Sequence, residues 1–107
     1  MAMAGPIDAP QLAISREEIE AFCLRNHIRK LSLFGSILTP RFREESDIDI
    51  LVEFEAGRVP GYFDLAGMEI ELTERLGRKV DLRTPGELSR YFRDKVMAGA
   101  AVQYERK

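Results

Sequence analysis

Residues 46–54 constrain the fold more than any other part of the chain. Apolar side chains occupy every second position of this segment, at Ile48, Ile50, Val52 and Phe54. This alternation is typical of a strand that buries one face. The chain therefore needs a sheet with an apolar layer packed against it, and its 107 residues have room for one domain with one core.

Helices that could supply this layer are indicated on both sides of the segment. A first helix is predicted to begin at Ser15, because Glu18 follows at the spacing of a capping box. An apolar stripe over residues 65–76 predicts a second helix. Thr84 and Glu87 form another capping box, with proline at the first helical position, and predict a third helix directly after them.

Three more strands are predicted, over residues 28–34, 79–83 and 101–105. The order of elements is then helix, strand, strand, helix, strand, helix, strand. It indicates an α/β or α+β fold, in which helices pack against a mixed β-sheet. We expect a flexible lead-in over residues 1–14, where glycine and proline occur without periodicity, and a single domain over 15–107.

The formal net charge of −2 conceals an uneven distribution of charge along the chain. Residues 44–74 carry one arginine and ten acidic residues, whereas the segments on either side are net positive. Such an acidic block can be a solvated surface, a disordered tail or a place that holds cations. Three glutamates of the second predicted helix are expected to be solvent-facing charges: Glu69, Glu71 and Glu74.

Several classes of protein are not expected. Apolar runs are far shorter than the ~20 residues of a membrane-spanning helix, and we see no secretory signal. The single cysteine, Cys23, reads as a core residue; it cannot form an internal disulfide, which fits a cytoplasmic location. His27 is expected to cap or pack at a helix end. The sequence has no basic stripe with interleaved aromatic residues, so direct nucleic-acid binding is not expected. Five aromatic residues are expected in the core or at an interface: Tyr62, Phe63, Tyr91, Phe92 and Tyr104.

Asp47 and Asp49 are unusual on a strand, because a half-buried surface desolvates their charges. At this spacing they share a face about 7 Å apart, where like charges repel by about 2–3 kcal/mol at an effective dielectric of ~20. Mg²⁺, which binds carboxylate and phosphate oxygens, would offset this repulsion. The alternative is the solvent-exposed face of an edge strand. A calcium loop is excluded, because Leu51 stands where a further oxygen ligand is needed.

Two more features complete the candidate site. Asp81 is the central residue of a short apolar strand, and Gly35 and Ser36 directly follow the strand over 28–34. Glycine lets a phosphate approach the backbone, and the serine hydroxyl adds a hydrogen-bond donor. Each feature alone also fits a surface charge or an ordinary turn. The spaced combination of all of them is much more specific.

These segments resemble a known family. LSLFGS at 31–36, SDIDILVEF at 46–54 and KVDLRTP at 79–85 are similar to the minimal nucleotidyltransferases of the DNA polymerase beta superfamily, and the resemblance covers roughly residues 15–105. It implies a polymerase beta-like nucleotidyltransferase fold. It also implies an enzyme that uses two Mg²⁺ ions as cofactors and ATP as substrate.

The same resemblance implies roles for individual residues. Gly35 and Ser36 match the pair that holds the nucleoside triphosphate. Asp47 and Asp49 match the two metal-binding acids, and Asp81 matches a third acid that also binds metal and completes the catalytic set.

One departure from the family concerns the triphosphate. Many members carry an arginine a few residues after the Gly-Ser pair, where this chain has Thr39 and Pro40, followed by Arg41 and Arg43. Either arginine can substitute for it, and a solvated loop is the alternative. Ser46 is a further candidate for nucleotide binding.

The resemblance also implies a partner. Family members of this size are commonly antitoxins encoded beside a HEPN-domain ribonuclease toxin, which they neutralise by transferring AMP from ATP to a toxin tyrosine. We expect a partner to supply the acceptor, in a homo- or hetero-oligomer. Two alternatives remain open: an antitoxin that acts by binding alone, and a nucleotidyltransferase for a small molecule such as an aminoglycoside.

Overall fold

The computed structural model describes residues 14–41, 43 and 45–106. Its elements follow the predicted order. They are α1 (Arg16–Arg25), β1 (Ile28–Phe34), the 3-10 turn η1 (Gly35–Leu38), β2 (Ile48–Phe54), α2 (Tyr62–Leu76), β3 (Val80–Arg83), the 3-10 turn η2 (Pro85–Glu87), α3 (Arg93–Gly99) and β4 (Ala101–Glu105). Residues 1–13 of the expected lead-in lie outside the described residues, and Ile14 packs against the core.

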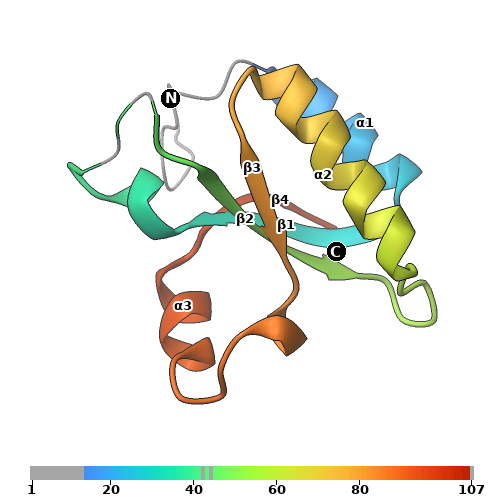
Figure 1. The fold of residues 1–107 in the computed structure, drawn as a ribbon. Coiled ribbons are helices and arrows are strands. Elements are labelled where there is room, and N and C mark those ends of the chain that lie inside the picture. The colour runs from blue at the N-terminus through green and yellow to red at the C-terminus, as the bar shows by residue number, and fades with distance from the viewer. Residues whose placement is uncertain (1–13, 42, 44, 107) are drawn as a thin grey trace.

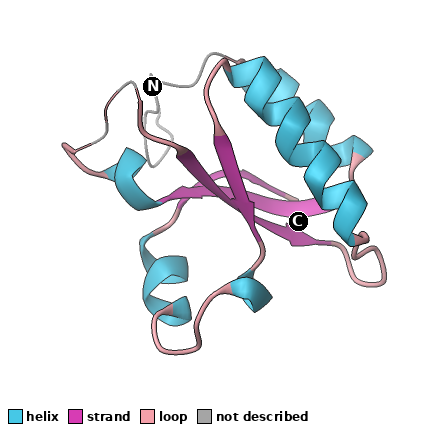
Figure 2. Ribbon diagram, in the orientation of Figure 1, coloured by secondary structure: helices cyan, strands magenta, loops and turns pink. Residues whose placement is uncertain are grey.

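The strands form one mixed sheet in the order β3-β2-β1-β4 (Figure 2). β1 runs antiparallel to both β2 and β4, and β2 runs parallel to β3. The prediction of a mixed sheet with helices packed against it is confirmed. Because β2 is central, it has one neighbour from each half of the chain.

Helices α1 and α2 lie side by side on one face of this sheet (Figure 1). The side chains of Ile48, Ile50 and Val52 are buried in the core that includes residues of both helices, so the alternation in the sequence identified the buried face of β2. Cys23 of α1 belongs to the same core. Burial raises the pKa of its thiol to about 12, so the thiol stays protonated at neutral pH and reads as a packing residue.

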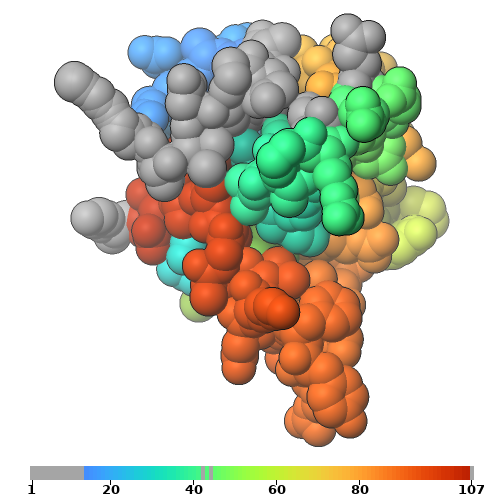
Figure 3. All heavy atoms as spheres, turned by 90° about the vertical axis from the view of Figure 1, so that its left-hand side faces the viewer, coloured from blue at the N-terminus to red at the C-terminus, as the bar shows by residue number. Residues whose placement is uncertain are grey.

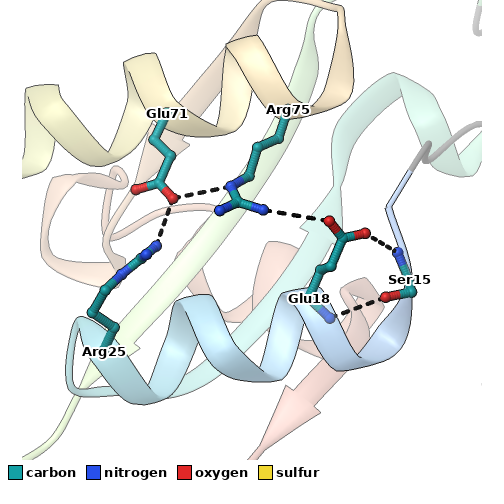
Figure 4. A network of polar contacts seen from close by, with 5 residues as sticks. All are labelled: Ser15, Glu18, Arg25, Glu71 and Arg75. Atoms are coloured by element: carbon teal, nitrogen blue, oxygen red, sulfur yellow. Dashed lines mark hydrogen bonds and ion pairs between the residues drawn. The ribbon is translucent and has the colours of Figure 1, made fainter.

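A chain of ion pairs joins the outer surfaces of α1 and α2 (Figure 4). Glu71 Oε2 lies 2.5 Å from Arg25 Nη2 and 3.0 Å from Arg75 Nε, and Arg75 Nη1 lies 3.4 Å from Glu18 Oε2. Glu18 also completes the predicted capping box with Ser15. Glu71 is therefore not the simple surface charge that we expect from the sequence. Exposed pairs of this kind each contribute about 0–1 kcal/mol.

The opposite face of the sheet is only partly covered. Ser32 and Leu51 are buried on this face, and η2 lies against β2. The orange segment after β3, which contains η2, projects from the body of the molecule in Figure 3. The N-terminal end of β2 and the C-terminal end of β1 pair with each other at one end of the sheet, and that is where Gly35 and Asp49 lie.

The third predicted helix is wrong in its position. The Thr84–Glu87 capping box is present, yet it closes only the short turn η2, and the helix α3 begins at Arg93. Leu88 departs from helical geometry with φ −82° and ψ 145°, and its side chain is buried. Its extended backbone ends the turn after the capping box.

One smaller expectation also needs correction. β2 begins at Ile48, so Asp47 precedes the strand instead of lying in it. Tyr62, Phe63 and Tyr91, expected in the core or at an interface, are 82%, 87% and 94% exposed, which excludes the core for these three and leaves the interface as a prediction. In the described part of the chain, no helix is long and apolar enough to span a membrane.

Candidate active site

The carboxylate of Asp49 lies directly against the backbone of Gly35. Asp49 pairs with Phe34 across the β1–β2 ladder, and the chain then turns at Gly35 with φ +79°. A Cβ atom on Gly35 would lie 2.1 Å from Asp49 Oδ2 and 3.0 Å from Asp49 Cγ. Only glycine combines this left-handed backbone with the missing side chain that the contact needs. On its other side, Asp49 is the register partner of Asp81 in β3.

Asp81 is held in place by contacts between β3 and α2. β3 lies at one edge of the sheet, and two side chains of α2 bind its backbone N–H groups. Val80 N donates to Thr73 Oγ1 at 3.0 Å, and Leu82 N donates to Glu69 Oε2 at 2.8 Å. The backbone on both sides of Asp81 is therefore anchored. Glu69 is half-buried in this role, so the expectation of a solvent-facing charge is wrong for it.

The carboxylate of Asp81 forms an ion pair with Arg83. Arg83 Nε lies 3.1 Å from Asp81 Oδ1, and Arg83 Nη2 donates to Asp81 Oδ2 at 3.3 Å. The two residues are two positions apart on one strand, so they share a face of the sheet. The hydrogen bond and the charge of Asp81 raise the pKa of Arg83. The guanidinium thus places a positive charge where the acids gather.

Burial raises the pKa of Asp49 above the usual range for aspartate. The negative charges of Asp81 and Asp47 raise it further, and the charge of Arg83 partly opposes them. Asp49 therefore lies within electrostatic range of both other predicted acids. The structure brings Asp47, Asp49 and Asp81 together from the loop before β2, from β2 itself and from β3.

The chemistry of these carboxylates fits a divalent cation. They supply the hard oxygen ligands that Mg²⁺ prefers, with a surplus of negative charge that raises the pKa of Asp49. Among the described residues, no three acidic, histidine or cysteine side chains already form a complete ligand set. Asp81 points to Arg83 instead. If all three acids bind a cation, the Asp81 carboxylate must leave Arg83 and bind the cation instead.

Gly35 and Ser36 open the turn η1 at the end of β1. The carbonyl of Ser36 accepts hydrogen bonds from Thr39 N at 2.9 Å and from Thr39 Oγ1 at 2.8 Å. These bonds close the turn and keep Ser36 next to the Gly35–Asp49 contact. The two residues predicted to bind nucleotide therefore adjoin the predicted metal-binding acids.

Ser46, Arg41 and Arg43 lie in the loop that leads to Asp47. Ser46 Oγ accepts a hydrogen bond from Arg43 N at 3.1 Å, and Ser46 N donates to Arg43 O at 3.1 Å. The structure thus gives Ser46 a role in closing a turn. Arg41 and Arg43 are both exposed, and nucleotide binding by these three residues stays a prediction.

A hollow of about 230 Å³ opens beside Asp81. Tyr62 and Leu65 from the start of α2 line it, together with Arg83 and Glu87. Asp81 is among its lining residues, so a second molecule can reach the acid from the N-terminal half of α2.

Comparison with protein-family models matches residues 16–102 to the nucleotidyltransferase domain. The chain belongs to the nucleotidyltransferase domain family. The match includes every residue of the candidate site, from Gly35 to Arg83. The resemblance to minimal nucleotidyltransferases, the nucleotidyltransferase fold and the assignment as an enzyme are confirmed.

Two archaeal relatives are named as protein adenylyltransferases. This nucleotidyltransferase is 34% identical over 82 residues to MJ0435 of Methanocaldococcus jannaschii. The aligned region covers 77% of this chain and 86% of that protein. It is 38% identical over 55 residues to MntA of Thermococcus cleftensis, and this aligned region covers 51% of this chain and 54% of that protein. The chain therefore spans about half the length of MntA.

Solved structures share the nucleotidyltransferase fold. A minimal nucleotidyltransferase has a TM-score of 0.70 at 32% identity, covering 91% of this chain and 97% of that one. A toxin–antitoxin complex with AMP-PNP gives 0.71 at 20% identity, over 88% and 76% of the two chains. A complex of MNT antitoxin with tri-AMPylated Shewanella oneidensis HEPN toxin gives 0.62 at 21% identity, over 84% and 69%. At these lower identities the likeness concerns the fold alone.

Sequence reasoning missed the residues that hold the acids in place. Arg83 had a signal, because a residue two positions from Asp81 on a strand shares its face. Thr73 and Glu69 had none. Their roles depend on how α2 packs against the edge of β3, which the helical pattern alone does not specify.

Replacement of Gly35 by alanine tests the packing of the Asp49 carboxylate. Gly35 and Gly57 both have positive φ, but a Cβ atom on Gly57 would meet no atom within 4 Å. Gly57→Ala therefore carries only the backbone strain, about 1–2 kcal/mol. We expect Gly35→Ala to lose more unfolding free energy than this in urea titrations and to lose nucleotide transfer, while Gly57→Ala keeps transfer. Equal losses in the two variants would contradict the contact.

Replacement of Asp49 by asparagine tests the crowding of charge. A carboxyl whose pKa is raised in the fold destabilises the fold when ionised, and this penalty disappears as the pH falls through that pKa. Without divalent cations, we expect Asp49→Asn to melt at a higher temperature than wild type at neutral pH. The difference should shrink as the pH is lowered, in thermal melts across a pH series. A lower melting temperature at neutral pH would show that the ionised carboxylate is stabilising.

Proposed function

We propose that this nucleotidyltransferase transfers AMP from ATP to a protein acceptor and thereby acts as an antitoxin. The acceptor that we propose is a tyrosine of a HEPN-domain ribonuclease toxin. The observation that carries the proposal is the contact of Asp49 with Gly35, with Asp81 as the register partner of Asp49 and Asp47 two residues before it. The names of the archaeal relatives support an acceptor that is a protein.

The residues divide the work by chemistry. Gly35 and Ser36 bind the triphosphate, because they open the turn η1 beside Asp49 and the Ser36 hydroxyl can donate a hydrogen bond to a phosphate oxygen. Asp47, Asp49 and Asp81 are the proposed ligands of Mg²⁺. When bound, Mg²⁺ neutralises phosphate charge and lowers the pKa of an attacking hydroxyl.

The transfer step uses the hollow beside Asp81. The acceptor hydroxyl oxygen forms a bond to the α-phosphorus of ATP, while the bond from that phosphorus to its bridging oxygen breaks. Pyrophosphate leaves with the electron pair, and Asp81 takes the hydroxyl proton. Asp81 can take the proton only after it leaves its ion pair with Arg83. In the absence of acceptor and nucleotide, the charge of Asp81 is balanced by Arg83.

The proposed setting is the cytoplasm, where ATP and a neighbouring toxin are both available. The lone cysteine, Cys23, is fully buried and has no disulfide partner in the chain. Near the acceptor hollow, Tyr62 and Phe63 are exposed and in edge-to-face contact, with ring centroids 6.0 Å apart. Exposed aromatic pairs of this kind are enriched in protein–protein interfaces.

A second candidate function is an antitoxin that masks its partner by binding alone. Two observations favour it: Thr39 and Pro40 replace the usual phosphate-side arginine, and the acids do not yet form a complete ligand set within the described residues. This candidate and the transferase make opposite predictions for variants that lack the acids.

Incubation with α-labelled ATP, Mg²⁺ and the product of the adjacent gene separates these functions. We expect wild type to label the partner, and Asp47→Ala/Asp49→Ala to lose the labelling because both central ligands are gone. Glu17→Ala/Glu74→Ala is the matched control, since both acids are exposed on the helices of the opposite face, and it should label normally.

Three results would overturn the proposal. Undiminished labelling by the Asp47→Ala/Asp49→Ala variant would exclude the mechanism. Rescue of growth by this variant in cells that express the toxin would favour an antitoxin that acts by binding. Nucleotide transfer to an aminoglycoside with no protein present would assign a small-molecule acceptor.

A further inference from the structure

Asp47 differs from the other two acids in how it is held. Asp49 and Asp81 belong to paired strands, whereas Asp47 precedes β2 and is exposed. The hydrogen bonds of the sheet therefore do not fix its position. That position depends on the turn of residues 43–46, which comes immediately before it.

The side chain of Arg78 binds this turn. Arg78 lies between α2 and β3, and its Nη2 donates hydrogen bonds to Arg43 O and to Ser46 O, the second at 3.2 Å. These two carbonyls are the two ends of the turn that Ser46 closes through Arg43 N. A single nitrogen of the guanidinium, Nη2, thus bridges both ends of the turn.

The backbone after Asp47 is bound by the neighbour of Arg78. Ile48 N donates to Lys79 O at 2.9 Å. Asp47 is therefore held between two attachments, at Ser46 O and at Ile48 N, and both lead to the same two-residue segment, Arg78–Lys79. No such device is needed for an ordinary exposed aspartate.

The electrostatics explain why Asp47 needs this restraint. Asp47 and Asp49 carry like charges two residues apart in the sequence, so the two carboxylates repel each other. An unrestrained loop would relax by moving Asp47 away from Asp49. A cation that uses both carboxylates would then have to bring the loop back when it binds.

We propose that Arg78 is a positioning residue that fixes Asp47 beside Asp49 as a ligand for a divalent cation. It acts through the backbone of the 43–46 turn and does not touch the nucleotide. The inference rests on the proposed metal-dependent transfer. It adds a residue outside the motifs at 31–36 and 46–54, on a segment that precedes β3.

Direct binding of Mn²⁺ to the full chain, followed by electron paramagnetic resonance without ATP, tests the proposal. Loss of a group that orients a metal ligand weakens metal affinity by about 10–100-fold, so we expect at least about a tenfold loss in Arg78→Ala. Arg75→Ala is the matched control, because Arg75 lies three residues earlier and binds Glu71 and Glu18 instead. It should bind Mn²⁺ as wild type does.

A double-mutant cycle separates positioning from general destabilisation. If Arg78 acts through Asp47, Arg78→Ala should weaken Mn²⁺ binding in wild type and have no further effect in Asp47→Ala. Equal effects in both backgrounds would overturn the proposal. Arg78→Met, which keeps the length of the side chain but donates no hydrogen bond, should weaken Mn²⁺ binding as Arg78→Ala does. It decides the question if Arg78→Ala does not fold, and wild-type affinity in Arg78→Met would then overturn the proposal.

The outcomes for Arg78 and for the proposed function are distinguishable. Wild-type Mn²⁺ affinity in Arg78→Ala, with labelling of the partner intact, would overturn the role of Arg78 alone. A wild-type chain that binds no Mn²⁺ and labels no partner would overturn both.

Discussion

The candidate site depends on one contact, the Asp49 carboxylate packed against the backbone of Gly35. It joins the end of β1 to the start of β2 at the point where the ladder between them ends. The turn after Gly35 places Ser36 beside the acids, and the parallel pairing of β2 with β3 brings Asp81 to the other side of Asp49. A side chain at position 35 would displace the acid that the other two surround.

This arrangement brings the negative charges of Asp47 and Asp81 within electrostatic range of Asp49. Desolvation and two like charges raise the pKa of Asp49, and the charge of Arg83 partly opposes them. Arg83 also pairs with Asp81, while Thr73 and Glu69 anchor the backbone around Asp81. A cation bound between these carboxylates would remove the repulsion, which is why we propose one for this site.

Much of the fold could be predicted from the sequence because its strongest signals are local. The alternation over 46–54 identified the buried face of β2, and the Ser15–Glu18 capping box marked the start of α1. The same kind of signal failed at Thr84–Glu87, where burial of Leu88 and an extended backbone override helical propensity. Local patterns predict which secondary structure a segment can form, and tertiary packing decides where that helix or strand ends.

The candidate site also contains residues that could be predicted from local sequence and residues whose roles depend on packing. Gly35, Ser36 and the three aspartates could be predicted as a group, because their combined spacing is specific although each alone also fits an ordinary turn or a surface charge. The roles of Thr73, Glu69 and Arg78 could not be predicted, since each is an ordinary polar residue until the elements are packed, whereas Arg83 had the signal of its spacing from Asp81 on one strand. The roles of Arg41, Arg43 and Ser46 toward nucleotide remain predictions, and the structure shows only that Ser46 closes a turn with Arg43.

The most direct test is a crystal structure of the chain with a non-hydrolysable ATP analogue and Mn²⁺, with the ion located by its anomalous scattering. We expect Mn²⁺ bound by Asp47 and Asp49, the triphosphate against Gly35 and Ser36, and Asp81 turned from Arg83 toward the metal. A bound analogue with Mn²⁺ away from these carboxylates, or with Asp81 still paired to Arg83, would contradict the three-acid cation site.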